Sequence, residues 1–351
     1  MERLLHPPGR NDTPYILGAF GGENIYVPTS AGTTRNLVTA DESKNTFLIC
    51  GGGGVVAPFP VPFHYHNETR HDFLCLKGQM KVWLNDQCRV LNAGDYASVA
   101  PKAKHSYQLI GDHTEHLGIV VPGGWEKFFR FIDDIYDGPL WPDVDMQNPR
   151  ETLVPRVVAA GEQFDVVTVR DHAYAQVQPW DPETDHLLRG NGDPYFLQNG
   201  RGPNACLGGT VVRPIATGAE TDNKFTLGSI EGSYVYKTQA LGNKYRFPTT
   251  PHLFFVAEGY VQITVNDEPE ARLGPSESIF LPAGTTFGIH VESRYVKLFS
   301  YSAPGGLVDL LYEAGKETPH TGPNCMIPES PQPWDKKTLA QLKSRFDFEL
   351  L

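Results

Sequence analysis

Apolar and polar residues alternate in short runs along most of this chain, and Gly, Pro and Asn-Asp turns separate the runs. In residues 71–86, "HDFLCLKGQMKVWLND", two such runs flank a Lys-Gly turn and end at Asn-Asp. An alternation of period two is typical of strands that bury one face, and many short strands of this kind are typical of a closed antiparallel barrel or jelly roll. The pattern therefore predicts an all-β protein with a few short helices.

The same pattern occurs twice in the chain. Residues 71–86 align with residues 252–267, "HLFFVAEGYVQITVND", and residues 91–109 align with residues 273–291. Such self-similarity indicates internal duplication. We predict an N-terminal barrel in residues 1–150, a connector in residues 151–204 and a C-terminal barrel in residues 205–351. The connector includes "QPWDPETDHLLRGNGDP", whose charged and Gly/Pro-rich composition is unlike a third core.

The last residues of the chain show a different period. Leu339, Leu342 and Phe346 recur at helical spacing in "PWDKKTLAQLKSRFDFELL". This spacing predicts a C-terminal helix that packs on a barrel or on a neighbouring subunit.

Composition and charge exclude several classes of function. The chain has a net charge of −11, and it lacks the clustered Lys and Arg that contacts with phosphate require. No nucleic-acid partner is therefore expected. No apolar run reaches about 18 residues and the N-terminus lacks a signal-peptide pattern, so we expect no membrane partner and a cytosolic location. The five Cys residues are scattered without a CxxC pair, which favours free thiols over disulfides or a zinc knuckle.

The candidate chemistry lies in "FHYHNETRH". His64 and His66 are two apart, so in a strand both imidazoles point to one face. His71 would come from the next strand across a short turn, and His105 from a later strand. Four converging imidazoles suit one transition metal ion per chain; Fe(II) or Cu(II) is the first expectation, with Ni(II) and Mn(II) as alternatives.

The second copy serves as an internal control. It has Tyr245, Phe247, His252 and Phe287 where the first copy has the four histidines. One imidazole among aromatic residues does not hold a metal, so we expect His252 to be a satisfied core histidine. The second barrel would then be a structural or dimerising partner, which makes a homodimer one expected assembly. His113 and His116 fall in a polar turn and are expected to be solvated.

These features together resemble a known family. The paired barrels, the HxH motif, the distal His105 and the segments "GDYASVAPKAKHSYQ", "GIVVPGGWEKFF" and "GDPYFLQNGRGPNACLGGTVVRPIATGAETDNKFTLGSI" are similar to the fungal quercetin 2,3-dioxygenases, which are bicupins. The resemblance implies one metal in the N-terminal cupin, held by three His and a Glu, and cleavage of a flavonol's heterocyclic ring by O2 with release of carbon monoxide. It matches His64, His66 and His105 to ligands, and Phe73 and Tyr107 to substrate-binding positions.

The main departure from this family is at His71, which stands where the family has its Glu. A Glu there would cancel one charge on the metal and accept a proton from the substrate. With His71 the site gains about one positive charge, which favours an anionic or enolised ligand. His71 is then either a ligand or a catalytic base.

Glu68 is a rival for the carboxylate role. It lies two residues beyond His66, and it could turn into the site as ligand or base. Alternatively, Glu68 is a solvated residue of the turn. Asp72 would point away from His71 and is expected to be exposed.

Three functions remain open from the sequence. The leading hypothesis is a mononuclear dioxygenase that cleaves a C–C bond in a flavonol or another enolisable aromatic or polyketide substrate with O2. The second is a cupin isomerase, lyase or cyclase that uses the metal as a Lewis acid without O2. The third is a non-catalytic binding bicupin.

Overall fold

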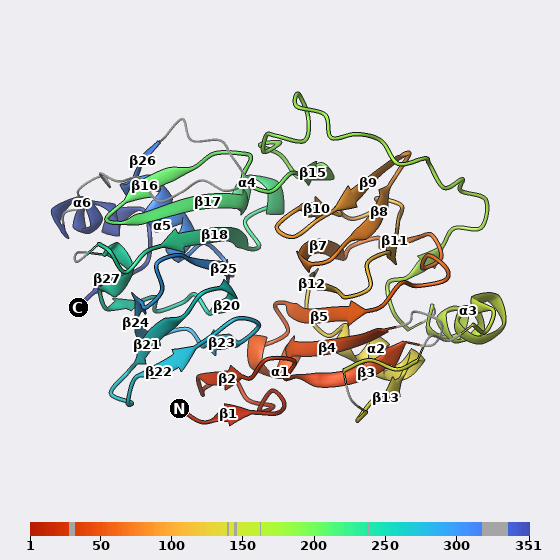
Figure 1. Ribbon diagram of the computed structural model, residues 1–351, viewed down its shortest axis with the longest axis horizontal. Helices are drawn as coiled ribbons and strands as arrows, with labels where there is room; N and C mark the ends of the chain where they lie inside the picture. Colours follow the sequence, from red (N-terminus) through yellow and green to blue (C-terminus); the bar gives the residue numbers. More distant parts are fainter. Residues whose placement is uncertain (28–31, 139, 144–145, 162, 237–238, 318–335) are drawn as a thin grey trace.

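The alternating runs of the two copies form two β-barrels that lie side by side (Figure 1). The computed structural model describes residues 1–27, 32–138, 140–143, 146–161, 163–236, 239–317 and 336–351. Strands dominate and the helices are few and short, so the predicted all-β fold with two barrels is confirmed.

The first barrel consists of two packed sheets. The larger has the order β13-β3-β4-β5-β12-β7-β10-β15, with bounds Asp134–Ile135, Glu23–Val27, Gly32–Val38, Leu48–Gly54, Thr114–Val121, Arg70–Lys77, Tyr96–Ser98 and Tyr195–Leu197. The smaller has the order β14-β6-β11-β8-β9, with bounds Val167–Thr168, His64–Tyr65, His105–Leu109, Met80–Leu84 and Gln87–Leu91. Side chains of both sheets share one buried apolar cluster.

The second barrel repeats this arrangement. Its larger sheet has the order β1-β2-β23-β20-β25-β18-β17-β16-β26, with bounds Arg3–Leu4, Tyr15–Leu17, Ser278–Leu281, His252–Glu258, Val296–Ser302, Thr226–Gly232, Thr210–Ala216, Ala205–Leu207 and Lys316–Glu317. Its smaller sheet has the order β22-β21-β24-β19-β27, with bounds Ala271–Leu273, Val261–Val265, Thr286–Val291, Tyr245–Arg246 and Glu349–Leu350.

Short helices repeat with the strands. The helices are α1 (Ala40–Ser43), α2 (Glu126–Ile132), α3 (Pro149–Ala160), α4 (Gly218–Thr221), α5 (Leu307–Ala314) and α6 (Lys336–Gln341), with 3-10 turns η1 (Ala240–Gly242) and η2 (Leu342–Ser344). Helices α1 and α4 begin with the same capping box, Thr39 with Glu42 and Thr217 with Glu220. The duplication therefore extends beyond the segments that the sequence aligns most clearly.

The predicted C-terminal helix is present but shorter than its apolar spacing suggests. Leu339 on α6 is fully buried in the second barrel's core. Leu342 and Phe346 pack partly buried on that core, although they lie in and after η2. Among the described residues, no helix is long and apolar enough to cross a membrane.

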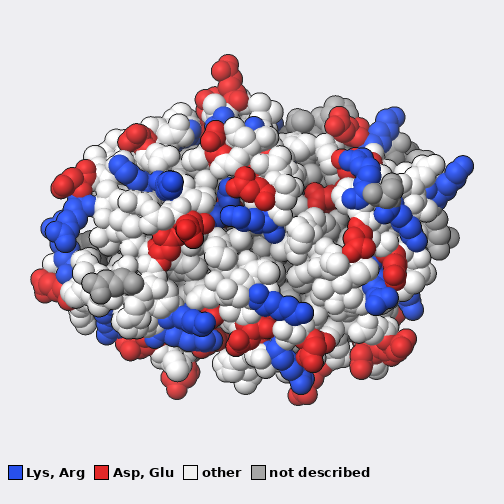
Figure 2. Space-filling model, turned by 180° about the vertical axis from the view of Figure 1, so that it is seen from behind, with Lys and Arg blue, Asp and Glu red and all other residues white. Residues whose placement is uncertain are grey.

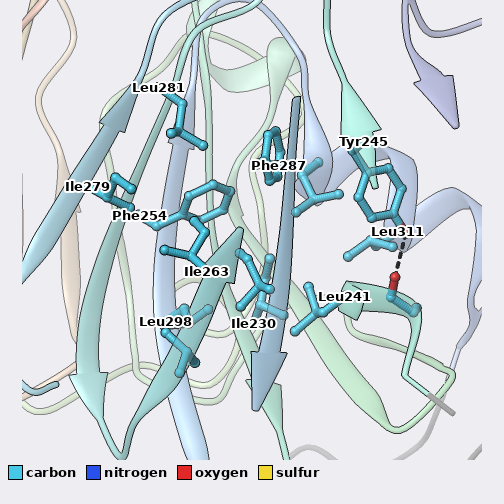
Figure 3. Close-up of a cluster of buried hydrophobic side chains, with 14 of the residues drawn as sticks. Ile230, Leu241, Tyr245, Phe254, Ile263, Ile279, Leu281, Phe287, Leu298 and Leu311 are labelled. Carbon is cyan, nitrogen blue, oxygen red and sulfur yellow. Dashed lines mark hydrogen bonds between the residues drawn. The ribbon is translucent and has the colours of Figure 1, made fainter. Parts of the chain in front are cut away.

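Strand alternation divides the apolar side chains between the barrel interiors and the interface between the barrels. On β20, Phe254 points into the second barrel, whose core is shown in Figure 3, while Leu253 and Phe255 pack in the interface. On β7, Phe73 lies inside the first barrel and Leu74 lies in the interface. Each barrel is thus buried on both faces of its larger sheet, which explains why these strands read as nearly continuous apolar runs.

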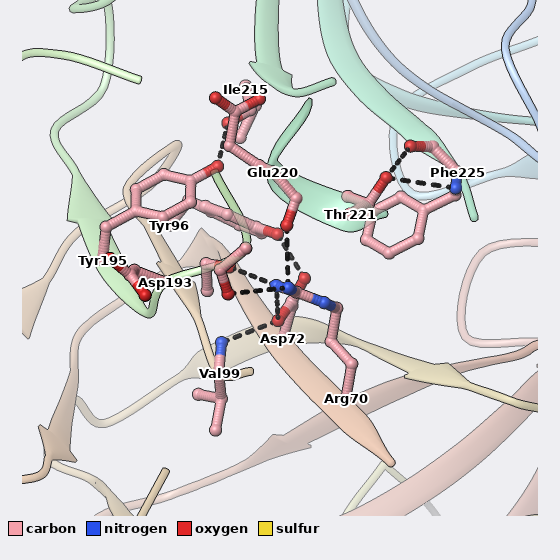
Figure 4. A network of polar contacts seen from close by, with 12 residues as sticks. Arg70, Asp72, Tyr96, Val99, Asp193, Tyr195, Ile215, Glu220, Thr221 and Phe225 are labelled. Atoms are coloured by element: carbon pink, nitrogen blue, oxygen red, sulfur yellow. Dashed lines mark hydrogen bonds and ion pairs between the residues drawn. The ribbon is translucent and has the colours of Figure 1, made fainter. Parts of the chain in front are cut away.

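Asp72 is part of this interface, so the expectation that it is exposed was wrong. It is fully buried, accepts a hydrogen bond from the Val99 backbone at 2.7 Å and binds the Tyr96 hydroxyl (Figure 4). Neighbouring Arg70 donates to the Glu220 carbonyl at 2.7 Å, across the interface. Asp72 does point away from His71, but that face of β7 meets the second barrel rather than water.

The larger sheet of each barrel includes a strand that precedes the other barrel in the sequence. Strand β2 lies at the start of the first copy but pairs with β23 of the second barrel. Strand β15 lies just before the second copy but pairs with β10 of the first barrel. The proposed domain limits at residues 150 and 205 stay a prediction. The sheets of the first barrel include β14 and β15 from the predicted connector, and the larger sheet of the second includes β1 and β2.

Figure 2 shows how charged side chains are distributed on one face of the molecule. On the face drawn in Figure 2, Lys and Arg are interspersed with Asp and Glu. That face therefore presents no continuous basic strip.

Candidate metal centre

Four histidines meet at one end of the first barrel. His64 on β6 lies opposite His105 on β11, His66 follows β6, and His71 projects from β7 on the facing sheet. One nitrogen from each ring can be chosen so that all four lie within 4.8 Å of one another. The structure thus brings together every histidine that the sequence proposed as a metal ligand.

Three of these rings are oriented by backbone carbonyls. The Nδ1 atom of His64 lies 2.8 Å from the Pro62 oxygen, that of His105 lies 3.1 Å from the Ala103 oxygen, and that of His66 lies 2.5 Å from the Asp165 oxygen. A carbonyl only accepts, so each Nδ1 carries the proton and each Nε2 keeps a free lone pair. Hydrogen bonds of this kind hold metal-binding histidines in place.

The Nε2 atoms of His66 and His105 are buried without a hydrogen-bond partner among the described residues. A buried polar atom without a partner costs about 1–3 kcal/mol. A metal ion at the centre of the cluster would satisfy both atoms, so the donor set fits a bound metal.

Burial keeps the four imidazoles neutral. It lowers the pKa of His66 to about 3, with His64 adding to the effect, and it lowers the pKa of His64, His71 and His105 as well. Neutral imidazole is the form that binds a metal. The cluster is therefore ready to accept a cation at ordinary pH, and the described residues add no carboxylate to it.

His71 is held differently from the other three. No hydrogen bond of its ring is found within the described residues; instead the ring packs on Phe73 at 4.4 Å between centroids. Its Nε2 lies beside Gly118, where an added Cβ would be 3.4 Å away. Both roles considered for His71, ligand or base, are compatible with this placement and stay a prediction.

An apolar cavity opens beside the cluster. It is lined by His64, His66 and His71, by Tyr107 of β11, and by apolar side chains of α2 and α3 such as Phe128 and Val157. The space open to the centre of a water molecule is about 80 Å³, several times the roughly 10–15 Å³ that one water needs. Side chains of α2 and α3 therefore border the histidines at this end of the barrel.

The two predicted substrate-binding residues have different positions. Tyr107 lines the cavity. Phe73 is fully buried behind His71, with its ring 5.2 Å from that of Tyr107, and it is absent from the cavity lining. Phe73 thus supports the wall that Tyr107 and His71 present.

The structure does not bring Glu68 to the cluster. Glu68 is exposed in the turn after His66, and its backbone N–H donates to Asp165 at 2.8 Å. Asp165 also accepts from the backbone of Asn67 and Thr69, which holds this turn outward. Glu68 is therefore placed as an exposed turn residue, the alternative that the sequence also offered, and its role as base or ligand stays a prediction.

Two residues that position His66 were missed in the sequence. Asp165 lies in the segment interpreted as a connector, where no motif or repeat distinguishes it from the other acidic residues. Trp125 packs its ring edge-on at 4.5 Å from His66 and donates to the Thr69 hydroxyl at 3.2 Å. The segment "GIVVPGGWEKFF" carries part of the family resemblance, but the contact between its Trp125 and His66 is formed only in the fold.

His116 is buried, so the expectation that it is solvated was wrong. It lies on β12 among Phe73 and Tyr107, and burial lowers its pKa to about 4. Gly52 makes room for it, since a Cβ there would lie 2.1 Å from the imidazole Cε1. His113 is half-exposed and binds Glu115 at 2.7 Å.

The equivalent place in the second barrel is filled by rings. Tyr245, Phe247 and Phe287 are buried around His252, whose Nε2 accepts from the Leu307 backbone at 3.2 Å. His252 is thus a satisfied core histidine, as expected. Within the described residues, the second barrel has no group of three metal-binding side chains.

Comparison with known proteins places these observations in context. Residues 54–121, which include all four histidines, match the Cupin domain family. The chain is 30% identical over 329 residues to a quercetin 2,3-dioxygenase of Aspergillus japonicus, covering 87% of this chain and 93% of the relative. It is 26% identical over 302 residues to a quercetin 2,3-dioxygenase of Bacillus subtilis (strain 168), covering 86% of this chain and 85% of that relative. The predicted resemblance is confirmed, and it extends to a bacterial enzyme.

Solved structures agree on the fold. Protein Ylba from E. coli superposes with a TM-score of 0.54 at 9% identity, covering 84% of this chain and 92% of that one. An oxalate decarboxylase of Lactobacillus farciminis, solved as a formate complex, superposes with a TM-score of 0.50 at 12% identity, covering 89% of this chain and 90% of that one. At these identities the likeness concerns the fold alone.

Proposed function

Because the chain belongs to the quercetin 2,3-dioxygenase family of cupins, we propose that it is a metal-dependent dioxygenase that cleaves a flavonol or a comparable enolisable aromatic substrate with O2. The observation that carries this proposal is the position of the histidines at the floor of an apolar cavity. Three of them present Nε2 lone pairs fixed by backbone hydrogen bonds. The aromatic and aliphatic lining above them suits a flat aromatic ring.

We propose that His64, His66, His71 and His105 hold one metal ion per chain. Imidazole donors suit Fe, Cu and Ni, so the donor set does not select one metal. Bound there, the ion would supply a Lewis-acid site that lowers the pKa of a phenol or enol and favours its anion. Since the described cluster holds no carboxylate, the preference for an anionic oxygen is stronger than with a Glu in the set.

The side chains around the cluster would bind and orient the substrate. Tyr107 lies on one wall, and Phe128 of α2 and Val157 of α3 lie on the others. Apolar side chains of α2 and α3 line the cavity, and a lining of low polarity strengthens electrostatic interactions inside it. His71, if it is not a ligand, would be the base nearest to the cluster.

Turnover of quercetin tests the proposal directly. The protein, reconstituted separately with Fe(II), Cu(II), Ni(II) and Mn(II), is mixed with quercetin under air while flavonol absorbance and O2 uptake are recorded. We expect loss of flavonol with matching O2 uptake in at least one metal form. His105→Ala is the control and should lose both metal and turnover.

An anaerobic arm separates the alternatives. Loss of substrate without O2 would contradict the dioxygenase and favour the Lewis-acid isomerase, lyase or cyclase. Absence of turnover in every metal form would contradict a quercetinase. A metal content far below one per chain after reconstitution would instead favour a binding protein.

A further inference from the structure

Asp133 is a buried carboxyl in the wall of the cavity. It follows the last residue of α2, and it lines the same cavity as His64, His66 and His71. The residue is 8% exposed, and neither of its carboxyl oxygens has a hydrogen-bond partner among the described residues. Such a group is rare, because buried carboxyls are nearly always hydrogen-bonded or paired.

The surroundings of Asp133 disfavour its charged form. Burial raises its pKa to about 8. The C-terminal end of a helix also disfavours a negative charge. Of the neighbouring charges, Arg156 on α3 lowers the pKa of Asp133 and Asp134 on β13 raises it, while Tyr107 faces it from β11. The fold therefore keeps an unpaired carboxyl whose protonation changes close to neutral pH.

The other acidic side chains near the histidines are already committed. Asp165 accepts from three backbone N–H groups, and Glu68 is exposed. Asp72 is buried on the opposite face of β7. Among the described residues that line the cavity, Asp133 is the carboxyl without a structural partner.

We propose that Asp133 is the catalytic residue that accepts a proton from a hydroxyl group of a phenolic or enolic substrate in this cavity, an inference that rests on the proposed function. In this step the substrate O–H bond breaks and its electron pair stays on the substrate oxygen. A new O–H bond forms on a carboxylate oxygen of Asp133. The products are an anionic substrate oxygen facing the histidines and a neutral Asp133, so charge and atoms balance.

The test uses 4-nitrocatechol, a phenol whose ionised form absorbs visible light, so neither O2 nor turnover is needed. It is bound to the metal-reconstituted protein and to the metal-free protein between pH 5 and 9. In the wild type we expect the bound probe to ionise at lower pH than in Asp133→Asn. The Asn variant should raise the pH at which half of the bound probe is ionised by about 1.

Asp134→Asn is the matched control. Asp134 is the adjacent acid, its side chain is 70% exposed, and it lies outside the cavity lining. This variant should still ionise the probe, with its midpoint moved slightly to lower pH, because a negative neighbour of Asp133 is removed. Arg156→Gln should move the midpoint in the opposite direction. Asp133→Glu, which keeps a carboxyl, should recover part of the wild-type behaviour.

The outcomes separate this inference from the proposed function. With quercetin under air, Asp133→Asn should retain full metal content while kcat falls about 10²–10⁴-fold. Unchanged probe ionisation together with wild-type turnover in Asp133→Asn would overturn the role of Asp133. If quercetin is never consumed while probe ionisation still depends on Asp133, the proposed function fails and the inference stands.

Discussion

Asp165 binds His66 from 99 positions further along the chain, through both its backbone and its side chain. Its carbonyl oxygen lies 2.5 Å from His66 Nδ1, and its carboxylate accepts from the backbone N–H groups of Asn67, Glu68 and Thr69 at 2.7, 2.8 and 2.9 Å. These N–H groups lower the pKa of Asp165 although burial opposes this. One residue thus fixes a candidate ligand and the turn that follows it.

Removal of the Asp165 carboxylate is expected to weaken metal binding. In Asp165→Ala the turn after His66 loses the three backbone hydrogen bonds to the carboxylate. The Asp165 carbonyl that holds His66 is then no longer fixed to this turn, so metal affinity should fall about 10–100-fold. Competition with a chelator measures this. Asp171→Asn, an exposed acid in the same segment, serves as control and should bind metal as the wild type does. An unchanged affinity in Asp165→Ala would show that the barrel alone orients His66.

Substitutions of His71 distinguish a ligand from a base. If His71 is a ligand, His71→Ala should lower metal occupancy as His64→Ala does, because both rings lie in the same cluster. Full occupancy with loss of turnover would make His71 a base. His71→Glu restores the carboxylate of the family pattern, and a gain of quercetinase activity would show that this position selects the substrate or the reaction. Elemental analysis and the O2 assay give both readouts.

Gly118→Ala should disturb the cluster from behind His71. The new Cβ would lie 2.8 Å from Cys50 Sγ, which must shift, and 3.4 Å from His71 Nε2, in close contact with that ring. We expect a loss of about 1–3 kcal/mol in stability and weaker metal binding. Gly18→Ala, whose Cβ would meet nothing nearer than Arg3 at 4.0 Å, is the control. If adding Cys50→Ala restores stability but not metal affinity, the ring of His71 is the part displaced.

The metal-free protein should lose stability as pH falls below about 6.5. An unfolded histidine binds a proton near that pH, whereas burial lowers the pKa of His66 in the folded protein to about 3. Between these values the unfolded chain holds more protons, so the free energy of unfolding decreases as pH falls, by about 1.4 kcal/mol per pH unit for each such histidine. Urea denaturation at pH 7 and pH 5 measures this change in the free energy of unfolding. His66→Gln should reduce this slope.

Asp133 should affect stability with the opposite pH dependence. Its pKa is raised to about 8 in the fold, while an unfolded Asp ionises near 4. As pH rises through that window the unfolded chain releases a proton that the folded protein retains, so the wild type loses stability. The side chain of Asn in Asp133→Asn does not titrate. The free energy of unfolding of this variant should therefore be higher than that of the wild type by more than about 1 kcal/mol at pH 8, and the difference should be smaller at pH 4. An equal difference at both pH values would contradict the placement of this carboxyl.

Sequence pattern was sufficient for the parts of the site that lie on repeated strands. His64, His66, His71 and His105 occur at fixed positions of a duplicated unit, so the aromatic residues of the second copy identified them by contrast.

The rest depended on contacts that no periodicity encodes. Asp165 and Asp133 lie outside the regular strands, in a loop and at a helix end, where one carboxylate resembles any other in the sequence. His116 and Asp72 looked polar and therefore exposed. They are buried because β12 and β7 are central strands with packed side chains on both faces.

The exchange of β2 and β15 bears on how such a protein can change over time. Strand β2, which precedes the first barrel, pairs in the larger sheet of the second, and β15, which precedes the second barrel, pairs in the larger sheet of the first. Neither half, taken with the strand that precedes it, can therefore be deleted without opening the sheet of its companion. After duplication, ligand residues in one copy are free to drift to Tyr and Phe, but the copy itself is retained. The barrel without the histidine cluster persists as half of the scaffold that keeps the other one closed.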